Sequence, residues 1–378
     1  DSAVKKYERK FNGRKTSQLR VSAKEIKEAR SKISREEVTA LQTMSARLSN
    51  SSPKIQIRGS RKFVAIPSVG CYIPGGQARY PSSVVMSVIP AKIAGVKRIV
   101  IVSPPDRDGK IDPLTIVAAK KCGATEIYKI GGAQAIGALA YGTKSIPKVD
   151  KIVGPGGKFV SIAKSLVSDQ TAIDMVAGPT ELGIIADASS DPELIALDLI
   201  SQAEHSRDTM CFVITQSKTM AKQIQKSIEK LIPGTERSSI IKESISKNGF
   251  IAICKNQNEM IELANKIAPE HLELMVKNAS SLSKKITGAG LLLIGEEIPS
   301  AASDYVIGTN HIIPTSGFGR TRGGLSVLDF LKLQTKIELK KSVPETKMKD
   351  LFSLDEVKLL TDAEGLPNHY KAVRRRLD

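Results

Sequence analysis

The sequence predicts an α/β protein built from two Rossmann-like parallel-sheet units, with small helical elements at its N- and C-terminal ends. From about residue 60, short runs rich in Val and Ile alternate regularly with helical stretches. Glycine-rich turns separate several of these strands from the helices that follow them. Because the strands exceed one compact Rossmann half, we divide them into two units near Thr180.

The first 58 residues are predicted to form a helical N-terminal segment. Ser22 followed by Glu25, and Ser34 followed by Glu37, fit the capping boxes that begin helices. The pattern is interrupted at Ser49–Pro53. Residues 1–20 are polar and lack the apolar stretch of a signal peptide, so we expect a cytoplasmic protein.

The two α/β units are predicted to span residues 59–180 and 181–320. Their strands are predicted at Arg98–Val102, Glu126–Ile130, Asp150–Val153, Leu182–Ala186, Cys211–Thr215, Phe250–Cys254, Leu272–Val276 and Leu291–Ile294. The helices between them include Asp112–Lys121, Ala133–Tyr141, Pro192–Glu204, Lys218–Leu231 and Glu259–Ile267. This alternation is typical of parallel sheets covered by helices, with ligands at the carboxyl ends of the strands.

Residues 321–378 are predicted to form a helical C-terminal tail. The strand pattern stops after about Thr315, and Leu325–Leu333 and Ser353–Arg376 look helical. A polar, lysine-rich stretch separates these two segments. Because so small a tail cannot bury a core of its own, we expect it to pack on another domain or another subunit.

The bulk composition is typical of a soluble globular protein. Apolar residues make up 41% of the chain and charged residues 25%. The longest apolar runs, such as Leu291–Ile294, are far shorter than the ~20 residues that cross a bilayer, so we expect no membrane partner. The four cysteines are spread widely and form no CxxC pair. A metal here would therefore need nitrogen and oxygen ligands.

The net charge of +18 makes nucleic-acid binding an alternative function. Lysines are dispersed among glutamates in the helix-like stretches 22–30 and 218–230, which is typical of solvated faces. Aromatic residues are only 4% of the chain and tryptophan is absent, so stacking platforms for single strands are scarce. We therefore expect no nucleic-acid partner, and we interpret the charge as attraction of an anionic ligand such as a dinucleotide.

Three glycine-rich segments could approach a phosphate group closely. They are Tyr72–Gly76, Gly131–Gln134 and Gly154–Gly157, each at a predicted strand-to-helix junction or just before a helix. Glycine lets the backbone come close to a phosphate, and a helix N-terminus offers unpaired N–H groups. None is a G-x-G-x-x-G fingerprint, so tight βα turns are an equally good interpretation.

The chain has four histidines, all in its second half. His205 follows Gln202 near the end of a predicted helix, and both side chains project from one face. His271 follows Glu270 directly, and nitrogen and oxygen ligands of this kind suit zinc. A lone histidine is more often a structural hydrogen-bonding residue. Spacing alone does not say which side chains meet, and it would favour Glu204 over Gln202.

These segments resemble the histidinol dehydrogenase family from roughly residue 20 to the C-terminus. The resemblance is carried by Ser68-Val-Gly-Cys-Tyr-Ile-Pro-Gly-Gly76, Ile130-Gly-Gly-Ala-Gln-Ala-Ile136, Ser201-Gln-Ala-Glu-His205, Pro269-Glu-His271, Ser303-Asp304-Tyr305 and Gly308-Thr-Asn-His311. Ala363-Glu364 and His369 extend it into the C-terminal tail. Several independent motifs in the same order make a chance match very improbable.

The resemblance implies a zinc-dependent, NAD-linked oxidation of L-histidinol to L-histidine through histidinaldehyde, the last step of histidine biosynthesis. It implies one zinc ion held by Gln202, His205, Asp304 and His369, which anchors the substrate and is not redox-active. His271 would then accept the alcohol proton. Glu270 would activate the water that adds to the aldehyde.

The same resemblance assigns the binding residues. Substrate contacts fall on Thr180, Gln202, His205, His271, Asp304, Glu364 and His369, and NAD contacts on Tyr72, Gln134 and Gly157. Gly157 replaces an asparagine that is common in the family, so the NAD site lacks an amide there. Thr180 stands where serine is frequent and keeps the hydroxyl.

The resemblance further implies a homodimer whose exchanged C-terminal tail completes the partner's site, and a supporting role for His311. Another NAD-linked alcohol or amino-alcohol dehydrogenase on the same scaffold stays an alternative. That enzyme would have no need for Glu364 as an imidazole-binding carboxylate.

Overall fold

The computed structural model describes residues 35–36, 60–75, 80–104, 111–144, 146–305, 307–338 and 353–377. The chain divides into two compact units, one of which is Phe63–Leu333. The second unit contains the described residues before and after that range. Arg35 and Glu36 are helical, whereas the proposed capping boxes at Ser22 and Ser34 lie outside the described residues, as does Gly76.

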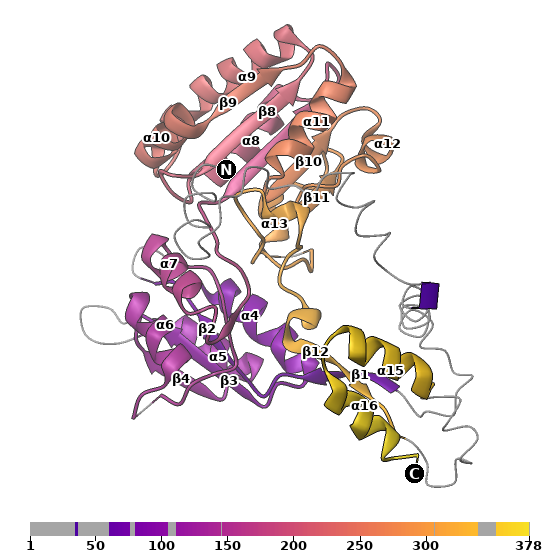
Figure 1. The fold of residues 1–378 in the computed structure, drawn as a ribbon. Coiled ribbons are helices and arrows are strands. Elements are labelled where there is room, and N and C mark those ends of the chain that lie inside the picture. Colours follow the sequence, from indigo (N-terminus) through magenta and orange to yellow (C-terminus); the bar gives the residue numbers. More distant parts are fainter. Residues whose placement is uncertain are drawn as a thin grey trace, which may run out of the picture. The chain divides into compact units, whose positions relative to one another are not determined.

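The first sheet of the large unit has five parallel strands in the order β4-β3-β2-β5-β6 (Figure 1). They are β2 (Ser68–Tyr72), β3 (Arg98–Ser103), β4 (Glu126–Lys129), β5 (Lys151–Val153) and β6 (Ala172–Ile173). This is the doubly wound order, in which the strand sequence reverses direction between β2 and β5.

Helices cover both faces of this sheet because successive side chains of a strand point to opposite sides. On one face Cys71 packs in a core with Val88 of α4 (Pro81–Ala94) and residues of α5 (Pro113–Cys122). On the other face Tyr72 packs with Leu139 of α6 (Gly132–Tyr141) and Val160 of α7 (Lys158–Leu166). The sheet is therefore the middle layer of an α/β/α sandwich.

The second sheet repeats the same plan in the order β11-β10-β7-β8-β9. Its strands are β7 (Glu181–Ala186), β8 (Met210–Thr215), β9 (Phe250–Ile253), β10 (His271–Met275) and β11 (Leu291–Ile294). One face packs against α8 (Pro192–Ala203), α9 (Lys218–Leu231) and α10 (Ser238–Asn248), and the other against α11 (Gln257–Ile267) and α12 (Ala279–Ser283). Shorter elements follow or interrupt these helices, namely η1 (Ile232–Gly234), α13 (Ser300–Ser303) and η2 (Phe318–Arg320).

The predicted fold class is confirmed by these two parallel sheets with their helices. Each strand predicted from the sequence is present, with both ends within one residue of the prediction. Along the chain, the first sheet ends with β6 and the second begins with β7. The domain boundaries at residues 58, 180 and 320 stay predictions.

The predicted helix at Leu325–Leu333 is wrong. Val327–Phe330 forms only a short 3-10 turn, η3, whose N-terminus is closed by a capping box between Ser326 and Asp329. The chain then continues as strand β12 (Leu331–Lys336), which pairs with β1 (Ser60–Ala65). Phe330 is fully buried in the first core, and its carbonyl accepts the N–H of Ile66 at 2.9 Å. This anchored residue ends the turn and starts the strand.

The C-terminal segment forms two helices instead of the single one predicted at Ser353–Arg376. They are α15 (Leu354–Ala363) and α16 (Pro367–Arg374). The break falls at Gly365, whose φ of +71° belongs to the left-handed region that favours glycine.

The four cysteines are free and buried, as the sequence predicts. In the described ranges no helix is both long and apolar enough to cross a bilayer.

Gly183 provides a test of how tightly the second sheet is packed. A Cβ atom at this position would lie 2.4 Å from Cζ of Phe212, a fully buried ring that is stacked on Phe250 with centroids 5.0 Å apart. We expect Gly183→Ala to lower the free energy of unfolding by about 1–3 kcal/mol, because the ring has no room to move. Denaturant-induced unfolding measures this change.

Gly137 is the matched control, since a Cβ there meets nothing within 4 Å and the residue lies inside helix α6. Gly137→Ala should raise the free energy of unfolding by up to about 1 kcal/mol through helix propensity. Equal effects of the two substitutions would contradict the packing described for β7 and β8.

Candidate active site

A small cavity of about 110 Å³ lies where the two sheets of the large unit meet. Gly154, which follows β5, lines it from the first sheet, and Thr180 and Glu270 line it from the second. His311 contributes from the loop after α13. The cavity therefore joins the two α/β halves of the unit.

The polar residues of the second sheet lie at the N-terminal ends of its strands. The sequence analysis expected ligands at the C-terminal ends. Thr180 immediately precedes β7, and His271 begins β10 beside it, with His271 aligned on Leu182. Helix α8 runs back along the sheet, so its last turn brings Gln202 to this same edge. In the first sheet, by contrast, the cavity is lined at the C-terminal end of a strand, because Gly154 directly follows β5.

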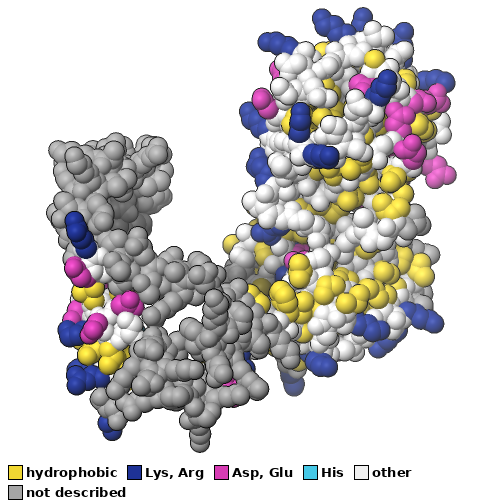
Figure 2. All heavy atoms as spheres, turned by 90° about the vertical axis from the view of Figure 1, so that its right-hand side faces the viewer, with side chains coloured by type: hydrophobic (Ala, Val, Ile, Leu, Met, Phe, Trp, Pro, Cys, Tyr) yellow, Lys and Arg dark blue, Asp and Glu magenta, His cyan; other side chains and the backbone are white. Residues whose placement is uncertain are grey.

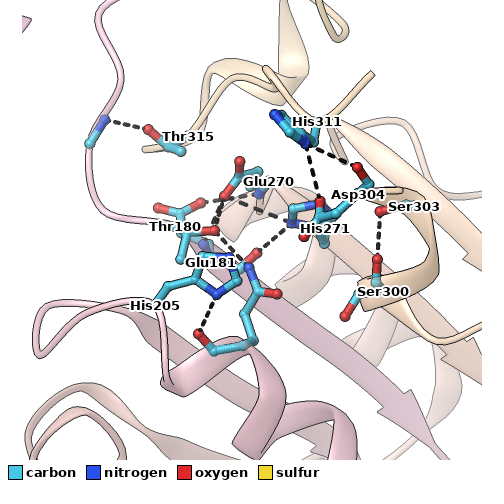
Figure 3. A network of polar contacts seen from close by, with 12 residues as sticks. Thr180, Glu181, His205, Glu270, His271, Ser300, Ser303, Asp304, His311 and Thr315 are labelled. Atoms are coloured by element: carbon cyan, nitrogen blue, oxygen red, sulfur yellow. Dashed lines mark hydrogen bonds and ion pairs between the residues drawn. The ribbon is translucent and has the colours of Figure 1, made fainter. Parts of the chain in front are cut away.

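Glu270 is a buried carboxyl group with two hydrogen-bond donors (Figure 3). The hydroxyl of Thr180 donates to its Oε2 at 2.5 Å, and the N–H of Glu181 donates to the same oxygen at 3.0 Å. Burial raises the pKa of Glu270 to about 8, although both hydrogen bonds oppose that rise. The charges of Glu181 and Asp304 raise it further. This carboxyl group therefore exchanges its proton near neutral pH, as a general base must.

His271 is buried and held in one tautomer. Its Nδ1 lies 3.2 Å from the carbonyl oxygen of Glu181, so Nδ1 carries the hydrogen and donates it. Burial lowers the pKa of His271, which favours the neutral ring. Its Nε2 is buried and has no hydrogen-bond partner among the described residues. A neutral imidazole with a free Nε2 is the form that can accept a proton.

Glu181 organises this site, and the sequence analysis missed it. One carboxylate oxygen accepts the N–H of Ser316 at 3.0 Å, and the other accepts the N–H of Glu270 at 3.2 Å. Burial raises its pKa as well. Only its position at the start of a predicted strand, where a buried charge is unusual, could have indicated this role.

Gln202 and His205 lie at the end of α8 with ligand atoms available. The side-chain amide of Gln202 donates from Nε2 to the Thr180 hydroxyl at 2.7 Å, a bond that does not use its carbonyl oxygen. His205 Nδ1 lies 3.1 Å from the backbone carbonyl of Gln202 and donates to it, so Nε2 is the ring atom that can bind a metal. Histidine ligands are commonly oriented through their second nitrogen in this way. Gln202 is buried whereas Glu204 and His205 are exposed, and the choice of Gln202 as a ligand stays a prediction.

Asp304 stands at the end of α13 and is close to His311 (Figure 3). His311 is held between Ser83, whose hydroxyl lies 3.3 Å from Nε2, and the backbone carbonyl of Asp304, 3.3 Å from Nδ1. Burial lowers the pKa of His311, the charge of Asp304 raises it, and the charges of His271 and His205 lower it further. The supporting role expected for His311 stays a prediction.

An amide oxygen, an imidazole nitrogen and a carboxylate at one place fit the chemistry of a zinc site. Across the described ranges, no three His, Cys, Asp or Glu side chains gather to hold a metal by themselves. In the large unit the expected set has only two ligands of these types, His205 and Asp304, because Gln202 is an amide and His369 belongs to the C-terminal unit. Glu364 caps α15 and His369 lies in α16 of that unit, and their roles stay predictions.

The residues expected to bind NAD surround the point where the first sheet reverses its strand order. The Tyr72 hydroxyl, at the end of β2, accepts the N–H of Gly132 at 3.1 Å. Gln134 lies in the first turn of α6. Gly157 caps the N-terminus of α7, and a Cβ there would meet nothing within 4 Å. The N-termini of α6 and α7 thus lie at the residues expected to bind NAD, and the positive end of a helix dipole favours a phosphate.

A buried ion pair, also missed by the sequence analysis, shapes the turn after β5. Lys164 and Asp174 are paired in the interior, and both bond to Gly154. Gly154 donates its N–H to Asp174 at 2.7 Å, and its carbonyl accepts from Lys164 at 3.0 Å. Gly154 has φ of +110°, and a Cβ would lie 2.2 Å from the carbonyl oxygen of Tyr72. The turn therefore requires glycine for steric reasons alone.

Comparison with known proteins gives a consistent picture. A family model described as histidinol dehydrogenase matches residues 1–377. The histidinol dehydrogenase of Oceanobacillus iheyensis is 41% identical over 387 residues, covering 100% of this chain and 89% of the relative. That of Methanocaldococcus jannaschii is 42% identical over 389 residues, with the same coverage.

A solved structure agrees with these relatives. The crystal structure of histidinol dehydrogenase from Elizabethkingia anophelis is similar with a TM-score of 0.79 and 35% identity, and the match covers 100% of this chain and 88% of that one. Both the family model and relatives above 40% identity span the whole chain. The chain belongs to the histidinol dehydrogenase family.

Proposed function

We propose that this protein oxidises L-histidinol to L-histidine in two NAD-linked steps, with histidinaldehyde between them and one zinc ion in the site. The observation that carries the proposal is the pairing of a neutral His271, whose buried Nε2 is free, with Glu270, a carboxyl group of raised pKa. The two steps need two proton acceptors, and these side chains are neighbours at one edge of the second sheet.

Zinc would be held by the amide oxygen of Gln202, the Nε2 of His205, the carboxylate of Asp304 and the imidazole of His369. When bound, the ion supplies an electrostatic anchor that fixes the imidazole and amine of the substrate. The orientation of His205 through its Nδ1 bond and of Gln202 through its bond to Thr180 supports this assignment.

In the first step the Nε2 of His271 accepts the proton of the substrate hydroxyl. The carbon that bears this hydroxyl transfers a hydride to NAD. The products are histidinaldehyde, NADH and a protonated imidazole. The Nδ1–H bond to the Glu181 carbonyl holds the ring while it becomes charged. The nearby carboxyl groups of Glu181 and Asp304 stabilise that charge.

In the second step Glu270 accepts a proton from the water that adds to the aldehyde carbon. The resulting anion of the hydrate loses a hydride to a second NAD and becomes a carboxylic acid, which releases its proton to solvent as the carboxylate of L-histidine forms. Glu270 lines the cavity, so the water can reach it. Its donors Thr180 and Glu181 hold the carboxylate in place while it is ionised.

NAD is proposed to bind where the first sheet reverses strand order, with contacts to Tyr72, Gln134 and Gly157. We further propose a homodimer in which Glu364 and His369 come from the second copy and complete the site. Such a biosynthetic enzyme is expected in the cytoplasm, with neither a membrane nor a nucleic-acid partner. On the face shown in Figure 2, Lys and Arg side chains are scattered and form no single stripe.

The activity assay is NADH production from L-histidinol by the full chain, with chelator, and with chelator followed by zinc. We expect NADH with zinc, its loss with chelator and its recovery when zinc is returned. A second amino alcohol without an imidazole is the control substrate. Equal rates with both substrates would favour a different amino-alcohol dehydrogenase, and no NADH under any metal condition would contradict the proposal.

Replacing Thr180 tests the proton acceptor of the second step. Thr180→Val removes a hydrogen bond that lowers the pKa of Glu270, so the pH at which aldehyde oxidation becomes fast should rise. Activity requires ionised Glu270, so the rate increases as pH passes its pKa. The pH profile of histidinaldehyde oxidation at saturating zinc measures the shift.

Thr180→Ser is the matched control, because it keeps the hydroxyl and should keep the profile of the parent. If the valine and serine variants have the same pH profile, Glu270 is not the group that titrates.

Gly157 provides a test of the NAD site. An asparagine fits there, because φ is −64° and the Cβ would stand in open space. We expect Gly157→Asn to lower the KM for NAD, since it supplies an amide beside the N-terminus of α7. The KM for L-histidinol should not change, and a lower KM for histidinol alone would argue against NAD binding at this turn.

A further inference from the structure

Two buried carboxyl groups, Asp198 and Glu273, lie next to one another behind the catalytic edge of the second sheet. Glu273 is 0% exposed and Asp198 is 9% exposed. Each is within hydrogen-bonding reach of the other. Neither lines the cavity and neither has a part in the chemistry proposed above. The steps above therefore give no reason for two acids to be buried here.

The pair connects the three elements that present the active-site residues. Asp198 lies one turn before Gln202, on the same face of α8. Glu273 lies two residues after His271, so both point to one face of β10. The backbone N–H of Ser300, the first residue of α13, donates to Oε1 of Glu273 at 2.7 Å. Helix α13 packs against α8 and leads directly into Asp304.

One proton is needed between these two groups. Two ionised carboxylates are both acceptors and repel each other, so only a proton lets them bond. Oε1 of Glu273 already accepts the Ser300 N–H, and Oε2 is buried without a hydrogen-bond partner among the described residues. The buried hydroxyl of Ser300 also faces Glu273, but it donates a single hydrogen and leaves the two carboxylates repelling each other. A proton on Oε2 would be donated to Asp198 and would satisfy both groups. The residues aligned with Glu273 on the adjoining strands, Ile184 and Leu293, are apolar.

The electrostatics agree with that arrangement. Burial raises the pKa of Glu273, and the charge of Asp198 raises it further, whereas the hydrogen bonds from Ser300 oppose the rise. Burial also raises the pKa of Asp198, so both groups favour a proton between them. Among the described residues, no cation contributes to the shift of either group.

We propose that Asp198 and Glu273 share one proton, and that the hydrogen bond it makes positions the site. The bond ties α8, β10 and α13 together, and these elements carry Gln202, His271 and Asp304. The inference rests on the proposed function for the roles of those three residues. Asp198 and Glu273 are positioning residues and touch neither substrate nor cofactor.

The shared proton makes the arrangement sensitive to pH in one direction. The pKa of Glu273 is higher in the folded protein than in the unfolded chain, so its contribution to stability is complete at acidic pH. That contribution is lost as pH rises through the folded pKa, when the proton leaves. The geometry of the proposed metal ligands should loosen in the same range.

The experiment compares the full chain with Glu273→Gln and Glu273→Met. Glutamine supplies a permanent donor to Asp198, whereas methionine has similar length and no donor. Zinc affinity is measured by competition with a chelator at mildly acidic and at alkaline pH. We expect the parent to lose affinity at alkaline pH relative to Glu273→Gln, and Glu273→Met to bind zinc about 10–100-fold more weakly at both.

The infrared absorption of a buried, protonated carboxylic acid reports the proton independently of metal or activity. Glu270 is also buried with a raised pKa and contributes in both proteins, so the readout is the difference between the spectra of the parent and of Glu273→Gln near neutral pH. The parent should show an additional band that the variant lacks. Identical spectra overturn the proposal, as does equal pH dependence of zinc affinity in the parent and Glu273→Gln. A parent that shows the band and these zinc affinities but makes no NADH contradicts the proposed function and leaves this inference standing.

Discussion

The parallel pairing of β7 with β10 is the constraint on which the candidate site depends. It aligns His271 with Leu182 and so places residues that are 90 positions apart, Thr180 and Glu270, in direct contact. Glu181 then bonds the backbone of Glu270, and its carbonyl fixes the ring of His271. A shift of this register by one residue would turn every one of these side chains to the opposite face.

Burial at that edge sets the proton chemistry. In a low-dielectric interior the charged form of any group is disfavoured, so carboxyl pKa values rise and imidazole pKa values fall. Burial raises the pKa of Glu270 to about 8 and lowers the pKa of His271. Glu270 therefore exchanges its proton near neutrality, and His271 is favoured as the neutral ring that can accept one. Burial of the two side chains is the main cause of both pKa shifts.

The sequence predicts most of the fold because the strands carry a strong Val and Ile signal. It misses β2, Ser68–Tyr72, where Ser, Gly and Cys weaken that signal. It also misplaces a helix at Leu325–Leu333, because the anchoring of Phe330 in a distant core is a tertiary effect. The local sequence pattern carries no information on the burial of Phe330 by residues that are distant in the sequence.

The site is predicted less completely than the fold. The family resemblance implies roles for Glu270, His271 and Gln202, which stay predictions, whereas spacing alone leaves the choice between Gln202 and Glu204 open. The burial of Glu181 and Glu273 cannot be predicted from the sequence, because nothing in the neighbouring residues distinguishes a buried glutamate from a solvated one. Their roles depend on which strand lies beside them, and that is decided only by the assembled sheets.

The division of labour between His271 and Glu270 is the central claim, and one measurement tests it most directly. Glu270→Gln is mixed with L-histidinol, zinc and excess NAD, and NADH and histidinaldehyde are quantified in a single turnover. The account predicts one NADH per site with histidinaldehyde accumulating and little L-histidine. Loss of the first NADH in this variant, with histidinaldehyde still oxidised at the parent rate, would contradict it.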